Sequence, residues 1–470
     1  MTDVSARPDD PPATTPADAA GRTLAVAAGA AFIAFLDLSV VNIAFPTIAQ
    51  SYPDTATGTL TWIVSGYAIA FAALLTPAGR LADVLGRRRL FALALAGFAV
   101  TSLLCGFAPD AAWLIAGRVL QGVAAAFMVP AALGLVLEAT PREKIGAAIG
   151  AWSAAGGFAA VVGPALGGAL VEVFGWRAIF LINVPIALVL IIPGLKLPGG
   201  AKTAARTSAL PDPLGTLSIA IGLGAIVAGV TEGGSWGWTA PGTLVALIGG
   251  VALTVFALVR SRHHASPAVA VSLWRTRQFA LANAGSFLFG ASMFAWLLAG
   301  PLFLNAIWQY SVLESAAALT VGAVASMVTA VLTGRITSPN GMRWIGVLGG
   351  LMAAASQGWM ATDAFGPDPA LWSAWVPAGL LGGGGIGIVV TVLGTAAASS
   401  VPPQQFAAGI GMNLTARQVG GALGVALLAA IFAGADTALS GFHLVFGVCG
   451  AISLAVALLL AWPAPARPTN

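Results

Sequence analysis

The sequence predicts an all-α membrane protein with fourteen transmembrane helices, and three observations lead to this fold class. Apolar residues make up 58% of the 470 residues, whereas charged residues make up only 8%; a soluble domain usually carries about 25% charged residues. A spanning helix needs about 20 mostly apolar residues, and the chain contains fourteen such runs. The basic residues cluster in alternate connections between these runs. Together these features exclude a large soluble helical protein.

The chain opens with a polar segment, residues 1–21, which is rich in Pro, Ala, Asp and Thr. It lacks the basic start, short apolar core and cleavage site of a signal peptide, so we expect a disordered cytoplasmic tail. The expected helices follow at residues 24–48, 59–79, 90–108, 112–137, 146–171, 177–195, 212–231, 240–259, 279–304, 313–334, 343–362, 369–395, 407–432 and 439–462.

The basic residues predict the orientation of these helices. With the amino terminus in the cytoplasm, all but three of the 21 Lys and Arg residues fall on the cytoplasmic side; Arg177 lies outside, and Arg118 and Arg417 lie within helices. Short cytoplasmic loops retain Lys and Arg during insertion. We therefore expect a multi-pass protein of the inner (cytoplasmic) membrane with both termini in the cytoplasm. The net charge of +4 then reflects orientation and not nucleic-acid binding.

Two polar connections divide the chain into a six-helix bundle over residues 22–195, a linker with two extra helices over 196–270, and a second six-helix bundle over 271–470. The two bundles contain matching sequence motifs at corresponding positions. The run 163–167 aligns with 420–424 at an offset of 257 residues. At an offset of 255, Gly79, Arg80, Gly86 and Arg88 recur as Gly334, Arg335, Gly341 and Arg343. Near-equal offsets predict a parallel duplication of six helices.

Four short motifs lie in the first bundle. The connection after its second helix reads Gly-Arg-Leu-Ala-Asp-Val-Leu-Gly-Arg-Arg-Arg over residues 79–89. The first helix contains Leu-Asp-Leu-Ser-Val-Val-Asn-Ile-Ala-Phe-Pro over 36–46, the fourth Arg-Val-Leu-Gln-Gly over 118–122, and the fifth Gly157 and Gly-Pro-Ala-Leu-Gly-Gly over 163–168. In this order the motifs resemble those of the major facilitator superfamily, and with fourteen spans those of its drug:proton antiporters.

This resemblance covers nearly the whole chain. It implies two six-helix bundles with two extra central helices, and it implies efflux of drugs in exchange for protons. Two positions depart from the pattern. Val84 stands where the family often has a basic residue, and Ser338 replaces the acid of the loop in its second copy.

Asp37 is the one acid that we place deep within a span, and Arg118 is the matching cation in the fourth helix. Intramembrane carboxylates are costly and usually functional. Desolvation favours the protonated acid, whereas a nearby arginine favours the carboxylate, so we expect Asp37 and Arg118 to couple transport to protons. The alternatives are a structural carboxylate bonded by Ser39 or Asn42, and an arginine that only joins two helices.

The fifth helix carries a glycine-rich stretch. Proline removes one helical hydrogen bond and bends the helix, while glycines permit close helix packing in lipid. We expect the stretch to pack across the interface between the bundles, and the resemblance implies that this seam favours exchange; ordinary helix packing is the alternative. The residues concerned are Gly157, Gly163, Pro164, Gly167 and Gly168.

The loop after the second helix is expected to act as a cytoplasmic gate. In the resemblance, its acid lies near a helix end of the other bundle, which here corresponds to residues 403–407. A helix amino terminus carries partial positive charge, so Asp83 beside it would hold the cytoplasmic side closed; the alternative is a loop that sets topology and meets anionic lipid. The gate residues are Gly79, Arg80, Asp83, Gly86, Arg87 and Arg88.

A substrate cavity is expected between the bundles near the middle of the membrane. Because no acid lies deep in the later helices, a neutral or singly positive apolar compound is expected there. The candidate residues are Asn42, Trp62, Tyr67, Gln121, Trp296, Asn305, Trp308, Asn413 and Arg417.

The sequence therefore predicts a monomeric, proton-driven antiporter that lies in the lipid bilayer and exports amphipathic organic compounds or drugs across the cytoplasmic membrane by alternating access. A proton-coupled metabolite transporter with a narrow substrate and a non-transporting membrane sensor remain as alternatives. No nucleophile–base pair, phosphate loop or metal cluster predicts an enzyme, a cofactor or a metal site. The spacing of the two cysteines, Cys105 and Cys449, is not that of a metal site, and neither is that of the pair His263 and His264.

Overall fold

The computed structural model describes residues 16–197 and 211–462, and these residues contain helices but no strands. Within these ranges, twelve helices are long and apolar enough to cross a membrane. The predicted all-α membrane fold is confirmed. Helices α6 and α13, at two of the fourteen expected positions, fall outside this set of twelve, so the count of fourteen spans stays a prediction.

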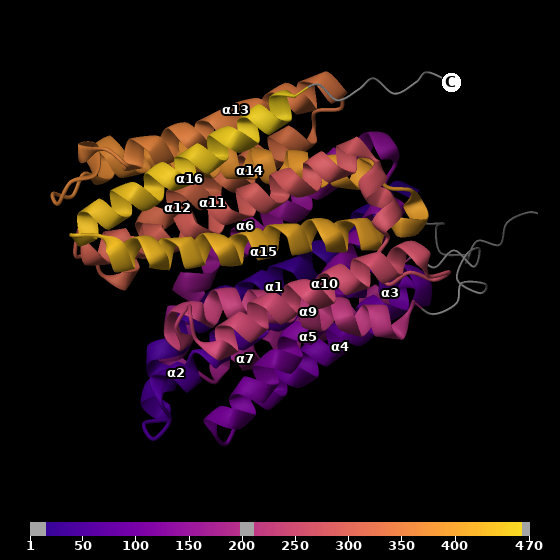
Figure 1. Ribbon diagram of the computed structural model, residues 1–470, viewed down its shortest axis with the longest axis horizontal. Coiled ribbons are helices and arrows are strands. Elements are labelled where there is room, and N and C mark those ends of the chain that lie inside the picture. Colours follow the sequence, from indigo (N-terminus) through magenta and orange to yellow (C-terminus); the bar gives the residue numbers. More distant parts are fainter. Residues whose placement is uncertain (1–15, 198–210, 463–470) are drawn as a thin grey trace, which may run out of the picture.

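The first bundle contains residues 16–195 (Figure 1). Its helices are α1 (Pro16–Ser51), the short α2 (Thr57–Leu60), α3 (Trp62–Leu85), α4 (Arg87–Gly106), α5 (Ala111–Ala139), α6 (Ile145–Phe174), α7 (Ala178–Leu181) and α8 (Asn183–Leu195). Helix α1 begins at Pro16, inside the tail expected over 1–21, and the rest of that tail lies outside the described residues. The sixth expected helix is broken between α7 and α8, with Pro185 in the first turn of α8, where proline is tolerated.

The second bundle contains residues 277–461. It consists of α11 (Arg277–Ala306), α12 (Val312–Gly334), α13 (Pro339–Met360), α14 (Val376–Ser399), α15 (Phe406–Gly434) and α16 (Ala438–Ala461). Short helical turns at Val271–Arg275, Asp363–Phe365, Leu371–Trp375 and Pro403–Gln405 join these helices, and a similar turn at Arg142–Lys144 precedes α6. Side-chain caps begin several helices: Ser311 and Glu314 form a capping box at α12, which satisfies amide groups left free at a helix start.

Two additional helices, α9 (Pro213–Trp236) and α10 (Pro241–His263), lie beside the line where the bundles meet (Figure 1). Helix α9 packs against α3 of the first bundle and α15 of the second. Gly222 and Gly250 face each other between α9 and α10, and a β-carbon on Gly222 would lie 2.9 Å from the Gly250 carbonyl oxygen. Small residues thus bring the two backbones together, as is usual between helices in lipid.

The bundles meet most closely at one end, which we call the basic end because it carries the connection between α3 and α4 with Arg87, Arg88 and Arg89. Gly86 makes the turn there with φ of 100°, a conformation that favours glycine. Gly79 on α3 packs on Ala407 at the start of α15, and Gly334 on α12 packs on Gly146 at the start of α6. The two approaches are related by the duplication, because α6 and α15 are the fifth helices of their bundles.

Toward the opposite end, residues of α1 and α6 are exposed or lack close neighbours. Phe158 on α6 is 48% exposed, Asn42 on α1 is exposed, and no atom lies within 4 Å of a β-carbon built on Gly157 or Gly168. Figure 1 shows the bundles diverging toward this opposite end, away from the basic end at the right. The structure therefore has a conformation closed at the basic end.

Candidate functional site

A cluster of fully buried polar side chains lies inside the first bundle, with Asp37 at its centre. Arg118 Nη1 donates to Asp37 Oδ2 at 2.5 Å, and Gln121 Nε2 and Asn183 Nδ2 each donate to Asp37 Oδ1 at 2.9 Å. Ser102 accepts a further hydrogen bond from Gln121 and one from Asn183, both at 3.0 Å. All five side chains are 0% exposed. A carboxylate out of water keeps its charge only with such partners.

The guanidinium of Arg118 is held from several sides. Its Nε donates to the Ile63 carbonyl at 2.9 Å, its Nη1 also donates to Gln121 at 2.7 Å, and its carbon lies 4.3 Å from the Tyr67 ring centre, within cation–π range. Arg118 Nη2 and Asn183 Oδ1 are buried without a hydrogen-bond partner in the described part of the chain. The cluster therefore has one spare donor and one spare acceptor beside the carboxylate.

The second bundle repeats this cluster without charge. Ser292 and Gln357 stand 255 residues after Asp37 and Ser102, at the same helix positions. The Ser292 hydroxyl lies within hydrogen-bond distance of Gln357 Oε1 at 3.2 Å and of Ser453 Oγ at 2.8 Å, and all three side chains are buried. Like Asn183, Ser453 comes from the sixth helix of its bundle. The geometry supports the predicted duplication, and at these equivalent positions of the described bundles only the first carries ionisable side chains.

The glycine-rich stretch of α6 does not pack where the sequence led us to expect. Gly163 and Gly167 face α1 of the same bundle: β-carbons there would lie 2.6 Å from Ser39 Cβ and 3.1 Å from Val40 Cβ. Gly157 and Gly168 have no neighbour within 4 Å, and the side chain of Pro164 lies outside the described atoms. Contact across the bundle interface is made instead by Gly146 and Gly150, nearer the start of α6. The expected seam is thus a contact with the helix that carries Asp37.

Asp83 lies against the start of α15, at the position expected for the gate. Its carboxylate accepts the backbone N–H groups of Ala407 at 3.2 Å and Ala408 at 2.8 Å, and it accepts Arg87 Nε at 2.8 Å. Arg87 also donates to Glu138 at 3.0 Å and to the Pro403 carbonyl. The acid and its arginine therefore bridge the two bundles at the basic end.

The other arginines of this loop also make specific contacts, which topology alone does not require. Arg80 Nε donates to the Pro267 carbonyl at 3.3 Å, and Arg88 Nη1 donates to the Leu197 carbonyl, after the end of α8, at 3.2 Å. In the second copy, Arg343 donates to the carbonyls of Leu460 and Ala461 at the end of α16. Ser338, which replaces the acid, caps its own helix by accepting the Gly341 N–H at 3.0 Å.

The predicted substrate residues do not form one cavity. Tyr67 and Gln121 belong to the Asp37 cluster, and Asn42 and Asn305 are exposed with their amides bonded to backbone carbonyls. The three tryptophans are engaged elsewhere: Trp62 stacks on Trp236 of α9, Trp296 donates to Met360, and Trp308 donates to the Gly366 carbonyl.

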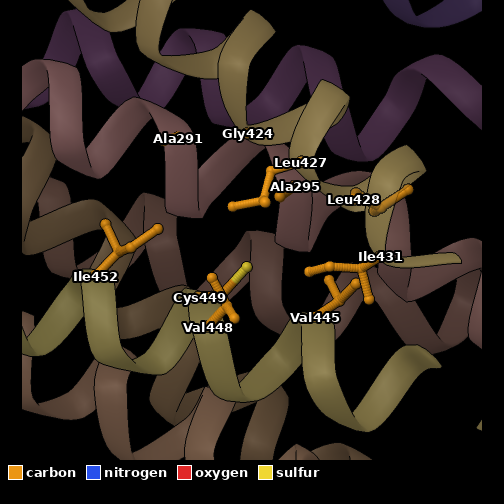
Figure 2. A pocket seen from close by; sticks show the side chains of 10 residues that line it. All are labelled: Ala291, Ala295, Gly424, Leu427, Leu428, Ile431, Val445, Val448, Cys449 and Ile452. Carbon is orange, nitrogen blue, oxygen red and sulfur yellow. The ribbon is translucent and has the colours of Figure 1, made fainter. Parts of the chain in front are cut away.

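Only Asn413 and Arg417 meet in a pocket between the bundles, where residues of α5, α6, α14 and α15 line the space. A second pocket, shown in Figure 2, lies between α11, α15 and α16 and is lined by aliphatic side chains and the Cys449 thiol. Because it offers no strong hydrogen-bonding group, it is a poor candidate for a specific site.

Sequence reasoning missed four residues that the structure places at these sites. Ser102 and Asn183 complete the Asp37 cluster, and Trp152 and Ser153 line the pocket with Arg417. Ser102 could have been identified from the duplication, because it stands 255 residues before Gln357. Polar residues at the same position of two repeated apolar helices are candidates for buried polar contacts. For the described residues, no group of three His, Cys, Asp or Glu side chains could hold a metal ion.

Comparison with known proteins agrees with this architecture. Residues 27–213 and 213–425 each match the Major Facilitator Superfamily. The puromycin resistance protein of Streptomyces alboniger is 35% identical over 456 residues, covering 93% of this chain and 88% of that protein. The probable actinorhodin transporter of Streptomyces coelicolor is 32% identical, covering 87% of this chain and 72% of that protein.

A solved structure shares the fold. A human organic anion transporter superposes with a TM-score of 0.70, covering 96% of this chain and all of that chain, at 15% sequence identity. The likeness at this identity concerns the arrangement of helices. The first matched range, residues 27–213, contains nearly all of the first bundle, and the second, residues 213–425, contains α9, α10 and the second bundle as far as α15.

Proposed function

The chain belongs to the major facilitator superfamily, and we propose that it is a proton-driven antiporter that exports amphipathic organic compounds by alternating access. In this proposal it works as a monomer in the cytoplasmic membrane, with the basic end and both termini in the cytoplasm. The observation that carries the proposal is the buried carboxylate of Asp37, held by Arg118, Gln121 and Asn183. The relatives named for antibiotic resistance and export support the substrate class and the direction of transport.

The cluster can respond to a proton. Protonation of Asp37 removes the charge that balances Arg118 and leaves a guanidinium bonded to neutral oxygens alone, so Arg118 is favoured to move toward another acceptor. Asn183 can serve either state of the acid, because its amide nitrogen donates to the carboxylate and its oxygen, now unpaired, can accept the acid proton. Since α1, α5 and α8 carry these residues, protonation changes how three helices of the first bundle are joined.

The present conformation fits the outward-facing stage of such a cycle. Asp83 and Arg87 close the basic end by contacts to Ala407, Ala408 and Pro403, while toward the opposite end Asn42 is exposed and Gly157 has no neighbour within 4 Å. In this proposal a proton enters from outside in this stage and is released after the basic end opens; because Asp37 itself is 0% exposed, its protonation requires a local opening of the first bundle. Alternating exposure of one central site is the general mechanism of transporters built from two bundles.

The test is proton flux in inverted membrane vesicles, whose acidified lumen corresponds to the cell exterior. A panel of amphipathic antibiotics including puromycin is added, and collapse of the gradient is followed with a pH-sensitive dye. We expect compound-dependent proton release from wild type and from Asp54→Asn, a matched change of an exposed acid. Asp37→Asn should lose this release but keep exchange of labelled compound without a gradient.

Two outcomes would overturn the proposal. Full proton release by Asp37→Asn would remove this carboxylate from coupling. A wild type that releases no proton with any compound would instead favour a sensor or a transporter of one narrow metabolite. Arg118→Lys provides a second variant, because a single ammonium group cannot reproduce the planar fork that joins Asp37, Gln121 and the Ile63 carbonyl, and we expect weakened coupling.

A further inference from the structure

The pocket between the bundles has a polar wall whose hydrogen-bonding groups are unused. Trp152 Nε1 and Ser153 Oγ on α6 are buried without a hydrogen-bond partner, within the ranges that the structure describes. Arg417 on α15 lines the same pocket and makes no hydrogen bond or ion pair with any described residue. Buried polar groups in folded proteins are nearly always paired. Arg417 is half-buried, and its guanidinium is not among the fully buried unpaired groups, so it faces the pocket as an accessible cation without a partner in the described part of the protein.

These three groups have one chemical character in common. An indole N–H and a guanidinium can only donate hydrogen bonds, and a serine hydroxyl can donate one. Asn413, one helical turn before Arg417, gives its amide nitrogen to Ser286 at 2.9 Å. The remaining described lining is aliphatic, with residues such as Leu133, Ile149 and Val390, and contains no acid. The pocket lining therefore combines a positive, donor-rich group of side chains from α6 and α15 with aliphatic side chains and no acid.

From this arrangement we propose that the pocket holds the anionic or acceptor-rich oxygen group of the exported compound, a carboxylate, phenolate or enolate, on Arg417, Trp152 and Ser153. The space open in this conformation is about 10 Å³, room for one water molecule, so the compound enters when the basic end opens, and its apolar body then lies against α5 and α14. This inference rests on the proposed export function and names its substrate class. It departs from the neutral or positive compound expected from the absence of acids in the later helices, because the decisive group is a cation without a partner.

The pocket also touches the helix that carries the proton site. The Trp152 ring packs edge-on against Phe35, with ring centres 6.2 Å apart, and Phe35 lies two residues before Asp37 on α1. A compound that hydrogen-bonds to the Trp152 indole therefore contacts a side chain that packs directly on α1, the helix that carries Asp37. This contact gives ligand binding and protonation a shared element, which is what coupling between two sites requires.

The experiment measures binding to the purified full chain in lipid nanodiscs, with three probes that share a pyrene body. Pyrenebutyrate is negative, its primary amide is neutral, and the matching trimethylammonium compound is positive. Binding is followed by energy transfer from protein tryptophans. We expect wild type to prefer the carboxylate over the amide by about 10- to 100-fold, the factor that a charge-assisted hydrogen bond provides, and to bind the ammonium weakest.

Three variants identify the groups responsible. Arg417→Gln should remove the preference by weakening the carboxylate alone, and Arg417→Lys should retain part of it. Trp152→Phe keeps an aromatic ring against Phe35 but removes the N–H, so we expect a loss of roughly 2- to 10-fold for the carboxylate. Arg277→Gln, the same change at an exposed arginine, should bind like wild type.

The inference is overturned if Arg417→Gln leaves the ratio of carboxylate to amide affinity unchanged, or if wild type prefers the ammonium probe. Because binding in nanodiscs needs no proton gradient, the outcome of the binding experiment is independent of the outcome of the proton-flux experiment. Asp37→Asn is expected to keep the preference for the carboxylate. If wild type shows that preference but no proton flux, the pocket stands and proton-driven export does not.

Discussion

The basic end offers the sharpest test of the conformational cycle, through Asp83→Asn. Asp83 is almost fully buried, at 1% exposure of its side chain, and accepts two backbone N–H groups from α15. The hydrogen bond between Asp83 and Arg87 lies within the first bundle and persists when the bundles separate. Only the two hydrogen bonds from Asp83 to α15 therefore stabilise the closed basic end. The change is small in volume and leaves the helix packing around Gly79 intact.

The expected magnitude follows from these two bonds. A hydrogen bond to a charged group contributes about 1.5–3 kcal/mol and a neutral one about 0.5–1.5 kcal/mol. Replacing the carboxylate by an amide therefore weakens closure by about 2–3 kcal/mol, and the amide nitrogen also faces donors. At 1.4 kcal/mol per factor of ten, the population open at the basic end should rise by roughly 30- to 150-fold.

The assay is alkylation of a cysteine placed at Thr76, which is 6% exposed and bonded to Thr415 of the other bundle at 2.8 Å. Because this position is buried between the bundles in the closed conformation, we expect N-ethylmaleimide to reach it when the basic end opens. The labelling rate of Thr76→Cys is compared with and without Asp83→Asn, with the exposed change Asp54→Asn as matched control. The two natural cysteines are buried, and the protein without the added cysteine gives the background.

Unchanged labelling in the Asp83→Asn background would refute the reasoning, because it would mean that the carboxylate does not hold α15. Equal acceleration by Asp54→Asn would refute it too, since any lost surface charge would then suffice. A rise confined to Asp83→Asn supports the role of helix-terminal N–H groups in binding an anion at the gate.

Two further predictions concern the packing of α6 and the linker before α9. Gly163→Ala places a β-carbon 2.6 Å from Ser39 Cβ and should destabilise the protein by about 1–3 kcal/mol, which is measured as a lower unfolding temperature in detergent. Gly157→Ala, with open space around the new β-carbon, should leave the unfolding temperature unchanged. Equal effects of the two changes would contradict the packing of α6 on α1. Asp212 is buried and lies outside the spans, and the hydrogen bond from Arg260 lowers its pKa below the ordinary value of 3.8. A lowered pKa of Asp212 stabilises the fold above pH 3.8, and this contribution is lost as the pH falls through the folded-state pKa. Wild type should therefore lose more thermal stability than Asp212→Asn on acidification from pH 5 to about pH 3. Equal losses in the two proteins would contradict the contact between Arg260 and Asp212.

The contact between Asp37 and Arg118 and the position of Asp83 could be anticipated, because a charge within an apolar run stands out and must find a partner. The same reasoning does not say which face of an apolar helix meets which neighbour. In lipid, a helix is apolar on its outer side as well as inside, so hydrophobic periodicity carries little information about packing. For this reason the sequence predicts the wrong neighbour for Gly163 and Gly167, which face α1, and predicts a cavity role for Trp62 and Trp308, which contact Trp236 and Gly366 instead.

Ser102, Asn183, Trp152 and Ser153 illustrate a second limit. A single serine or tryptophan in a spanning helix is ordinary, and its role depends on whether its polar atom has a partner in three dimensions. Ser102 and Asn183 use theirs to hold a carboxylate, whereas Trp152 and Ser153 leave theirs unpaired beside Arg417. Only the folded chain distinguishes these two situations, and the unpaired groups are the ones that indicate a ligand.

The duplication gives the two bundles the same scaffold but different chemistry. The first bundle keeps the acid of the loop and the acid of the buried cluster, Asp83 and Asp37; the corresponding positions of the second are Ser338 and Ser292, which hydrogen-bond locally. The second bundle instead supplies Arg417 at the interface. If an anion leaves while one proton enters, two positive charges move inward per cycle, and a membrane potential negative inside contributes about 2.3 kcal/mol per charge for each 100 mV. If the proposed proton site and ligand site act together, the gradient and the potential both drive export, and the contact of Trp152 with Phe35 links the pocket between the bundles to the helix that carries Asp37.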